Sequence, residues 1–493
     1  MRKSAPDILR WISVAFLIAA VITVFYELVS YSRSRSVNPE TMTVAGVPVG
    51  GLTREETTER LVQVYGTDLE LYHGEERILL NPAAVGFSLD TEVMIAAAEE
   101  QRSEAAFWQG FWDFLWNRPG EEISIPLRSE FSTSQLETYL QDIAARYDIP
   151  PLPPEPIPGS PTFGPGTPGK VLDIERCIDL IGDALNDPED RSVELVLDEE
   201  TPLRATLETL EILIKQNLDV EEFDGLAAIY IRDLQTGEEL HFSYYENEDI
   251  ALEPDIAFTA ASTNKISIML SYYRYFDLPF DAEAERWVRE MITESGNDPA
   301  DWLMDRMTDL GELPGPLMVT RTINEDLGLE NTFIVGFYRT SPILRVMETP
   351  GNQRLDINTR PDPYNQTTSG EIGLLLSDMY ACANNGGALL AAFPGEISAE
   401  ECQQMLDTMS ENYLGSLIQG GVPDGTRVAH KHGWTQSPLD MVSDAGIVFS
   451  PGGDYVLSIF LWNDPEMIWT PTSRIVANLS KAVYNYFNPP VVE

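Results

Sequence analysis

The segment "FTAASTNKISIML" (258–270) places a serine and a lysine three residues apart in a largely apolar run. Ser262 and Lys265 form the only S-x-x-K in the chain, which has six lysines beside 26 arginines. Arginine almost never loses its proton in a protein, whereas a buried lysine can lose its proton and act as a base. On a helix, this spacing puts both side chains on one face. The pair predicts a serine nucleophile at a helix start with a neutral lysine as its base; the alternative is a capping serine beside a chance lysine.

Two further short motifs follow along the chain. S-G-N stands at 295–297 between helical stretches, and K-H-G-W stands at 431–434 before the last hairpin. A glycine there lets a substrate backbone lie close, and an N–H at a strand edge can point at an oxyanion. Each motif alone is weak, because serine, glycine and asparagine are ordinary loop residues.

The elements around these motifs predict one antiparallel sheet. Residues 225–245 and 444–463 each read as a hairpin, and 473–487 reads as a closing helix. Strands at both ends with helices between them indicate an α+β domain, in which the returning chain completes the sheet and helices pack on it.

The order hairpin, S-x-x-K, S-x-N, K-x-G resembles the serine β-lactamase and penicillin-binding-protein family, in particular the class A β-lactamase-like branch. The resemblance covers about 220–490. Supporting pieces are "DLQTGEEL", "PDIAFTAASTNK", "NQTTSGEIGLLLSDMY" and "DAGIV". It implies a β-lactamase/transpeptidase-like fold and a serine hydrolase that acts on β-lactams or peptidoglycan-derived amides. It calls for no metal and no other cofactor.

The resemblance also implies a role for each motif residue. Ser262 would attack the acyl carbon, with Lys265 as its general base. Ser295 would relay a proton to the leaving nitrogen, and Asn297 would contact the substrate amide and Lys265. Lys431 would hold Ser295 and the substrate carboxylate.

The remaining substrate-binding residues that the resemblance implies follow Lys431 directly. They are His432, Gly433 and Trp434. The backbone N–H groups of Ser262 and Trp434 would form the oxyanion hole. Two histidines at 430 and 432 suggest no metal site, because no third ligand is evident.

Three departures from the family pattern matter for turnover. Gly296 replaces the aspartate of S-D-N, and His432 replaces the hydroxyl residue of K-T-G. No E-x-x-L-N segment supplies the glutamate that activates the deacylating water. Glu348, Asp356 and Asp362 are candidate substitutes. Without such a base the acyl-enzyme would persist, which leaves open a non-catalytic wall-binding protein or a DD-carboxypeptidase.

The N-terminus predicts a membrane anchor. Three basic residues precede an uncharged stretch at 11–26, and no small-residue cleavage site follows it. The apolar stretch, its aromatic ends and the flanking arginines are typical of one N-terminal transmembrane helix, and a core helix is the alternative. We expect a single-pass cell-membrane protein whose bulk is extracytoplasmic.

Between anchor and hydrolase the sequence repeats a small α+β unit. "GFSLDTEVMI" (86–95) and "GKVLDIERCI" (169–178) match, and Asp90 and Asp173 can each cap a following helix. With "VAGVPVGGLTREE", they resemble the repeats assigned to peptidoglycan binding in VanW-like proteins, which implies cell-wall contact. A spacer is the alternative. The predicted domains are 1–36 (tail and anchor), 37–150 (repeat 1), 151–210 (Pro-rich linker and repeat 2) and 211–493 (hydrolase).

Composition sets the remaining expectations. The net charge of −47 excludes nucleic acid as a partner, because such a surface repels phosphate backbones. The three cysteines read most simply as buried thiols, although Cys382 and Cys402 can pair if the chain is exported. The aromatic helix at 107–116 is more typical of a protein core than of a membrane surface.

Overall fold

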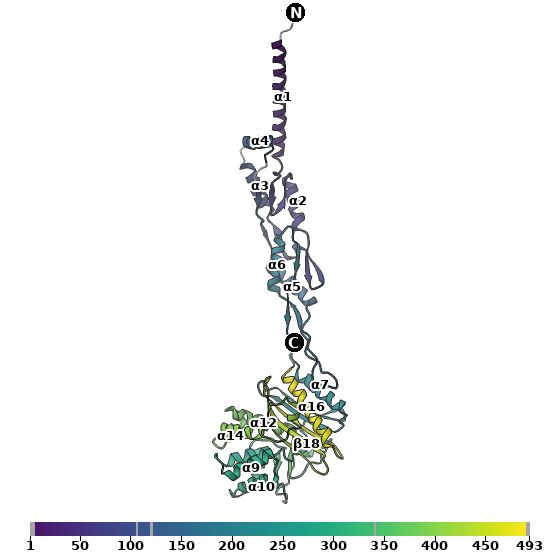
Figure 1. Cartoon of the computed structure of the whole chain (residues 1–493), viewed down its shortest axis with the longest axis vertical. Helices are drawn as coiled ribbons and strands as arrows, with labels where there is room; N and C mark the ends of the chain where they lie inside the picture. Colours follow the sequence, from purple (N-terminus) through teal and green to yellow (C-terminus); the bar gives the residue numbers. More distant parts are fainter. Residues whose placement is uncertain (1–4, 105–106, 119–121, 340–341, 490–493) are drawn as a thin grey trace. The chain divides into compact units, whose positions relative to one another are not determined.

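The computed structural model describes the chain in four stretches, 5–104, 107–118, 122–339 and 342–489 (Figure 1). The chain forms two compact units. The first comprises Met1–Leu152 and Thr167–Pro202, and the second comprises Pro153–Gly166 and Leu203–Glu493. The four-part division by domain stays a prediction.

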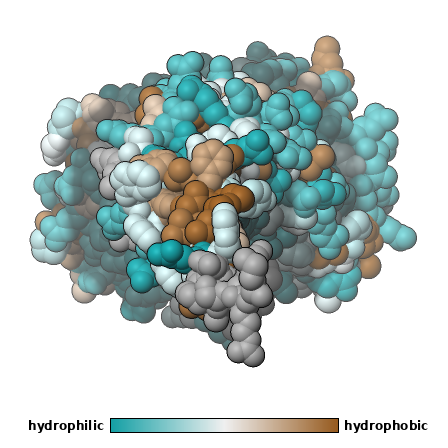
Figure 2. Space-filling model, turned by 90° about the horizontal axis from the view of Figure 1, so that it is seen from above, coloured by the Kyte–Doolittle hydropathy of each residue, from teal (hydrophilic) through white to brown (hydrophobic). Residues whose placement is uncertain are grey.

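The first unit begins with a long apolar helix. Helix α1 covers Ala5–Ser34, and its stretch Leu9–Ser34 has a mean hydropathy of 2.4. This stretch is long and apolar enough to cross a membrane, by length and composition. Figure 2 shows the hydrophobic residues visible from this end gathered in one patch, among residues that are mostly hydrophilic.

A small α+β layer follows α1 in the chain. Its sheet has the order β2-β1-β6, with β1 and β6 parallel. Its elements are β1 (Met42–Val44), β2 (Val47–Pro48), α2 (Arg54–Tyr65), α3 (Thr91–Glu104), α4 (Phe107–Leu115) and β6 (Ile123–Ile125). Ala45 and Gly46 turn the chain with positive φ, so β1 and β2 form a hairpin. Thr53 and Glu56 form a capping box at the start of α2.

A second α+β layer completes the unit. Three small sheets have the orders β4-β3-β9, β10-β8 and β5-β7. The elements are β3 (Leu69–His73), β4 (Glu76–Leu80), η1 (Pro82–Val85), β5 (Ser88–Leu89), β7 (Ser129–Glu130), α5 (Thr133–Tyr147), β8 (Gly169–Leu172), α6 (Ile174–Asn186), β9 (Ser192–Glu194) and β10 (Leu197–Glu200).

The predicted repeat is visible as two similar helix starts. Asp90 accepts the N–H of Val93 before α3, and Asp173 accepts the N–H of Arg176 at the start of α6, both at 3.1 Å. Each helix leads to a strand that pairs in parallel with an earlier one, β6 with β1 and β9 with β3. The two copies therefore interleave along the chain.

The second unit is built on a six-stranded antiparallel sheet, and the predicted fold is confirmed. The order is β13-β12-β11-β19-β18-β17, so the first hairpin pairs with the last. The strands are β11 (Leu226–Asp233), β12 (Glu239–Tyr245), β13 (Glu248–Ile250), β17 (Arg427–Trp434), β18 (Met441–Phe449) and β19 (Tyr455–Trp462).

Side chains alternate between the two faces of this sheet, and each face belongs to a separate hydrophobic core. Ala228 and Tyr230 belong to one cluster, whereas Ile229 and Ile231 belong to the other. The second face is covered by α7 (Leu207–Val220) and α16 (Trp469–Phe487), which lie together beside the sheet in Figure 1. Burying each such aliphatic side chain contributes about 1.5–3 kcal/mol, so both faces hold the sheet in place.

The first face carries the helices that surround the predicted site. They are α8 (Lys265–Tyr275), α9 (Ala282–Thr293), α10 (Asn297–Thr308), α11 (Gly315–Thr320), η2 (Arg321–Asp326), α12 (Ser369–Ala383), α13 (Gly387–Ala392) and α14 (Ala399–Ser410). A short sheet of order β14-β16-β15 joins them, made of β14 (Phe258–Thr259), β15 (Phe333–Ile334) and β16 (Asn365–Thr367). The turns η3 (Gly351–Gln353) and α15 (Ile418–Gly421) complete the unit.

The Pro-rich segment belongs to this second unit. Within Pro153–Gly166, the carbonyl of Ser160 accepts from Asn217 and that of Pro161 accepts from Asn485. Phe163 is buried against Tyr486. The segment is therefore a loop held by specific contacts.

Two of the three cysteines are bonded, so the expectation of three buried thiols is wrong. Cys382 on α12 and Cys402 on α14 form a disulfide across a sequence separation of 20 residues, and Cys177 is buried and free. The bond ties two helices that pack against each other beneath the sheet.

Replacing both Cys382 and Cys402 by serine should lower the free energy of unfolding of the second unit by about 3 kcal/mol, because the unfolded chain loses a cross-link closing a loop of this length. Denaturant unfolding without reductant measures the change. Reductant should weaken the natural protein and leave the double variant unaltered. Equal unfolding midpoints for the two proteins would contradict the prediction.

Candidate active site

Ser262 lies in a tight turn between β14 and α8. The N–H of Thr263 donates to the carbonyl of Ala260 at 3.0 Å, and the N–H of Lys265 donates to the carbonyl of Ser262 at 3.2 Å. Helix α8 begins at Lys265, three residues later than the sequence suggests. Ser262 is half-buried, while the residues that follow it are buried. The turn thus presents the hydroxyl just ahead of a helix N-terminus.

The Lys265 amine lies at the centre of the site. Its Nζ is 3.1 Å from Ser262 Oγ, 2.6 Å from the carbonyl oxygen of Ser295 and 2.8 Å from Asn297 Oδ1. Lys265 has no exposed surface. Two of its three polar neighbours, the carbonyl of Ser295 and Asn297 Oδ1, can only accept hydrogen bonds. A neutral amine that donates to both therefore directs its lone pair at the serine hydroxyl.

Burial shifts the protonation of this amine. Desolvation and, next in effect, the nearby charge of Lys431 lower the pKa of Lys265 to about 6, against the attraction of Asp301. At neutral pH the amine is therefore mostly uncharged, with a lone pair available beside Ser262 Oγ.

A second buried amine reaches the same place from the sheet. Lys431 on β17 donates from Nζ to Ser295 Oγ at 2.9 Å and to the carbonyl of His432 at 3.1 Å. Burial lowers the pKa of Lys431 to about 7, against the attraction of Asp444. The sequence places Lys265 and Lys431 far apart, and the fold brings both amines to Ser295.

Ser295 connects the two lysines. Its carbonyl accepts from Lys265 while its hydroxyl accepts from Lys431. Its φ of 60° lies in the left-handed region, which a non-glycine residue adopts at a cost. The turn into α10 sets that conformation, and it directs the two oxygens of one residue to two different amines.

Steric crowding explains why the residue before α10 is a glycine. A Cβ at Gly296 would lie 2.9 Å from Pro299 Cδ and 3.0 Å from its Cγ. An aspartate at this position, as in S-D-N, would need Pro299 to shift. Its absence leaves the contact of Asn297 with Lys265 intact.

Gly433 packs directly on the turn at 260–263, which contains Ser262. A Cβ there would lie 2.7 Å from Thr263 Oγ1 and 2.9 Å from the carbonyl oxygen of Ala260. The sequence predicts that this glycine makes room for substrate. In the structure its lack of a side chain also lets β17 approach the Ser262 turn.

The edge of β17 supports the predicted oxyanion hole. The N–H of Thr435 donates to the carbonyl of Met441. By the register of the two strands, the N–H groups of Gly433 and Lys431 point toward β18 as well. Because N–H groups alternate in direction along an antiparallel strand, that of Trp434 points away from β18, on the side where the sheet has no further strand.

His432 is buried and uncharged. Its ring stacks on Trp434 with centroids 5.0 Å apart, and its Nδ1 is 3.4 Å from Asn412 Nδ2. Burial, with the charge of Lys431 next in effect, lowers the pKa of His432 to about 2. His432 supplies no positive charge. Of the residues at 431–434, Lys431 is therefore the one that could attract a substrate carboxylate. Substrate binding by His432, Gly433 and Trp434 stays a prediction.

Three site residues were not found from the sequence. Tyr338 Oη and Asn365 Nδ2 donate to the carbonyl of Ala261 at 2.9 and 2.8 Å, and Lys265 Nζ lies 4.8 Å from the Tyr338 ring centroid. Asp301, on α10, accepts the backbone N–H groups of residues 338 and 339. The motif containing Asn365 is visible in the sequence, but its hydrogen bond to the nucleophile turn is not.

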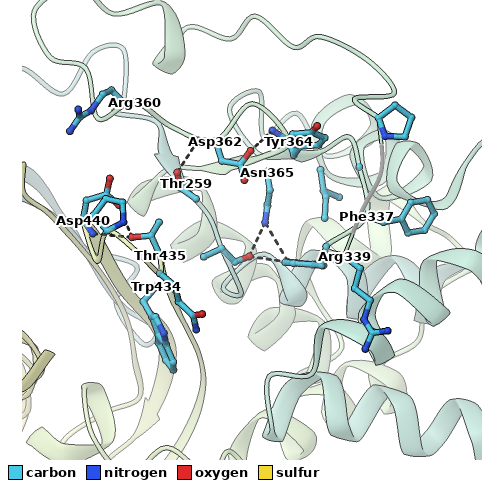
Figure 3. Close-up of a pocket in the computed structure, with 17 residues that line it drawn as sticks. Thr259, Phe337, Arg339, Arg360, Asp362, Tyr364, Asn365, Trp434, Thr435 and Asp440 are labelled. Carbon is cyan, nitrogen blue, oxygen red and sulfur yellow. Dashed lines mark hydrogen bonds between the residues drawn. The ribbon is translucent and has the colours of Figure 1, made fainter. Parts of the chain in front are cut away.

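A cavity of about 980 Å³ opens beside the turn that contains Ser262 (Figure 3). Ala261, Tyr338, Asn365 and Trp434 line it, so it borders both the Ser262 turn and the edge of β17. Figure 3 shows Asp362 close to Asn365, across the cavity from Trp434.

Of the three carboxylates proposed as substitutes for the missing glutamate, only Asp362 lines this cavity. Glu348 is exposed, and Asp356 is exposed and paired with Arg354, which lowers the pKa of Asp356 to about 2. Burial raises the pKa of Asp362, whose Oδ1 accepts the N–H of Tyr364 at 2.8 Å.

Comparisons with known proteins find similarity to one family model and to solved structures. Residues 280–487 match the model of the beta-lactamase enzyme family. The structure of PBP-A in an acyl-enzyme complex with penicillin G is 21% identical, covers 59% of this chain and 100% of that one, and has a TM-score of 0.40. The beta-lactamase from Sphaerobacter thermophilus DSM 20745 is 19% identical, with 58% and 100% covered and a TM-score of 0.42. No curated protein matches.

The match to the beta-lactamase enzyme family confirms the predicted resemblance over residues 280–487, within the second unit. The matched residues begin after Ser262 and Lys265, so the roles of these two rest on the geometry above. The VanW-like repeats stay a prediction.

Acylation of Ser262 should rise with pH, with a midpoint near pH 6, because Lys265 accepts the serine proton only after losing its own. Replacing Lys431 by methionine removes one cause of the lowered pKa, so the midpoint should move to higher pH. Replacing Lys431 by arginine keeps the charge and should leave it in place. Stopped-flow acylation rates across pH measure this, and an unmoved midpoint in the methionine variant would contradict it.

Proposed function

We propose that this protein is a membrane-anchored, extracytoplasmic serine hydrolase that is acylated at Ser262 by β-lactams or related cell-wall amides and deacylates slowly. The observation that carries the proposal is the continuous set of contacts from Ser262 Oγ through Lys265 Nζ and Ser295 to Lys431 Nζ. A purely structural pair of buried lysines would be better stabilised by carboxylates than by each other.

The geometry supports a simple sequence of proton transfers. Neutral Lys265 takes the proton of Ser262 as Oγ bonds to the carbonyl carbon of the amide. The N–H groups of Ser262 and Trp434 stabilise the oxyanion. As the C–N bond breaks, Ser295 passes its hydroxyl proton to the leaving nitrogen and regains one from Lys431 Nζ, which donates to that hydroxyl. The proton taken from Ser262 stays on Lys265. The product is an ester of Ser262.

Deacylation needs a water to attack this ester, and Asp362 is our candidate for the base that activates it. It lines the cavity, and its raised pKa makes its carboxylate a better base than an exposed one. Among the hydrogen bonds of the described residues, none joins Asp362 to Ser262 or Lys265. A base held by the neighbouring backbone instead of the nucleophile is consistent with slow hydrolysis.

Two features support an extracytoplasmic location. Helix α1 carries a stretch suited to crossing a membrane, and the Cys382–Cys402 disulfide is typical of oxidising compartments. A β-lactam or peptidoglycan-derived substrate would be met there, and the anchor would keep the enzyme near the wall.

Incubation with a fluorescent penicillin should label the protein, and intact-mass spectrometry should show one added acyl group. The Ser262→Ala variant should show none, because it lacks the hydroxyl that lies 3.1 Å from Lys265 Nζ. Ser267→Ala, on α8, removes a buried hydroxyl that makes no hydrogen bond to either amine; it is the matched control and should label normally. An unlabelled natural protein, or equal labelling of Ser262→Ala, overturns the proposal. Release of D-alanine from a pentapeptide would identify a DD-carboxypeptidase.

Replacing Asp362 by asparagine should prolong the acyl-enzyme by on the order of 10²-fold while acylation stays unchanged, because the amide keeps the shape and loses the base. The decay of the labelled species measures this. Asp356→Asn, an exposed carboxylate on the same segment, should decay like the natural protein. An adduct that decays equally in both variants excludes Asp362 as the base.

A further inference from the structure

The first unit exposes a row of tryptophans that its own core does not use. Trp108, Trp112 and Trp116 are 64%, 58% and 70% exposed, although the sequence suggests a core helix for 107–116. The three residues are spaced i, i+4 and i+8 on α4 and the turn that continues it, so they share one face. The expectation of a core helix is wrong for this face.

The other face of α4 is fixed against α1. The Tyr31 ring packs on Phe107, Phe111 and Phe114 with centroid distances of 5.3, 5.7 and 5.4 Å. A Cβ at Gly110 would lie 2.1 Å from Tyr31 Oη, so only glycine allows this approach. Helix α4 therefore has a defined place beside Tyr31.

Tyr31 lies where the membrane span ends. A span of about 20 residues crosses the hydrocarbon core, so one that begins at Trp11 reaches its other side near residue 30. Figure 1 shows α4 at this end of α1, drawn across the helix and not along it. The contacts with Tyr31 thus hold α4 at the level of the lipid headgroups.

The chemistry of the exposed face suits that level. Tryptophan is enriched at membrane interfaces, where its ring is buried among acyl chains and its N–H stays hydrated. Within α4, Asp113 is the one acidic residue, and it pairs with Arg118. Arg35, one turn beyond Tyr31, lies over the Phe107 ring at 5.5 Å.

We infer that α4 is an interfacial helix that lies on the outer membrane surface around α1, with Trp108, Trp112 and Trp116 inserted among the lipids. The inference rests on the proposed membrane anchor. It adds a second membrane contact that fixes the first unit against the bilayer, where α1 alone would leave it free to rotate about one helix.

Environment-sensitive fluorophores on single cysteines test this in the full-length protein, reconstituted in phosphatidylcholine vesicles. The background carries Cys177→Ser, which removes the free thiol and keeps the disulfide. Labels are placed by Trp112→Cys on α4, by Leu17→Cys within the span, and by Glu75→Cys at an exposed turn of the same unit. Trp116→Cys repeats the α4 measurement at a second exposed position.

The label at 112 should be shielded from aqueous iodide several-fold more than the label at 75, and it should be quenched by lipids brominated near the headgroup. The label at 17 should respond to deeply brominated lipids. A label at 112 as accessible as that at 75, with 17 buried, overturns the inference and leaves the anchor standing. Accessible labels at both 112 and 17 overturn the anchor as well. A label at 112 that resists iodide but ignores brominated lipid overturns the inference in favour of a protein covering.

Discussion

Two amines buried close together are the constraint on which the second unit depends. Lys265 and Lys431 are each without exposed surface. Burial lowers the pKa of both amines because it removes the water that would stabilise their charge. A folded chain keeps such a pair at a loss of stability, since both amines would be protonated at neutral pH once unfolded. The surrounding structure must therefore hold them in place.

That support comes from three separate parts of the fold. Helix α8 supplies Lys265, the turn before α10 supplies Ser295, and the edge strand β17 supplies Lys431. The sheet is anchored by hydrophobic cores on both faces, so its edge is a rigid platform. Tyr338 and Asn365 hold the Ala261 carbonyl and so fix the Ser262 turn. Strain at Ser295 is tolerated because its neighbours over-determine its position.

Much of this could be predicted from the sequence because it depends on local patterns. The two hairpins, the closing helix and the caps at Asp90 and Asp173 follow from alternation and capping chemistry, and the rarity of lysine directs attention to 265 and 431. The remaining features depend on what packs where. No local signal shows that Gly296 avoids Pro299, that Asp301 holds the backbone at 338–339, or that the tryptophans of α4 face outward while its phenylalanines pack on Tyr31.

The interleaved order of segments affects how the chain matures. Strand β9 completes the sheet that β3 begins some 120 residues earlier, and the loop Pro153–Gly166 joins a body whose other residues all come after 202. As the chain emerges from N- to C-terminus, the first unit must wait for residues beyond 190, and the loop must wait for partners not yet made. The first unit can therefore close once residues to 202 are made, whereas the loop stays without its partners until the second unit follows.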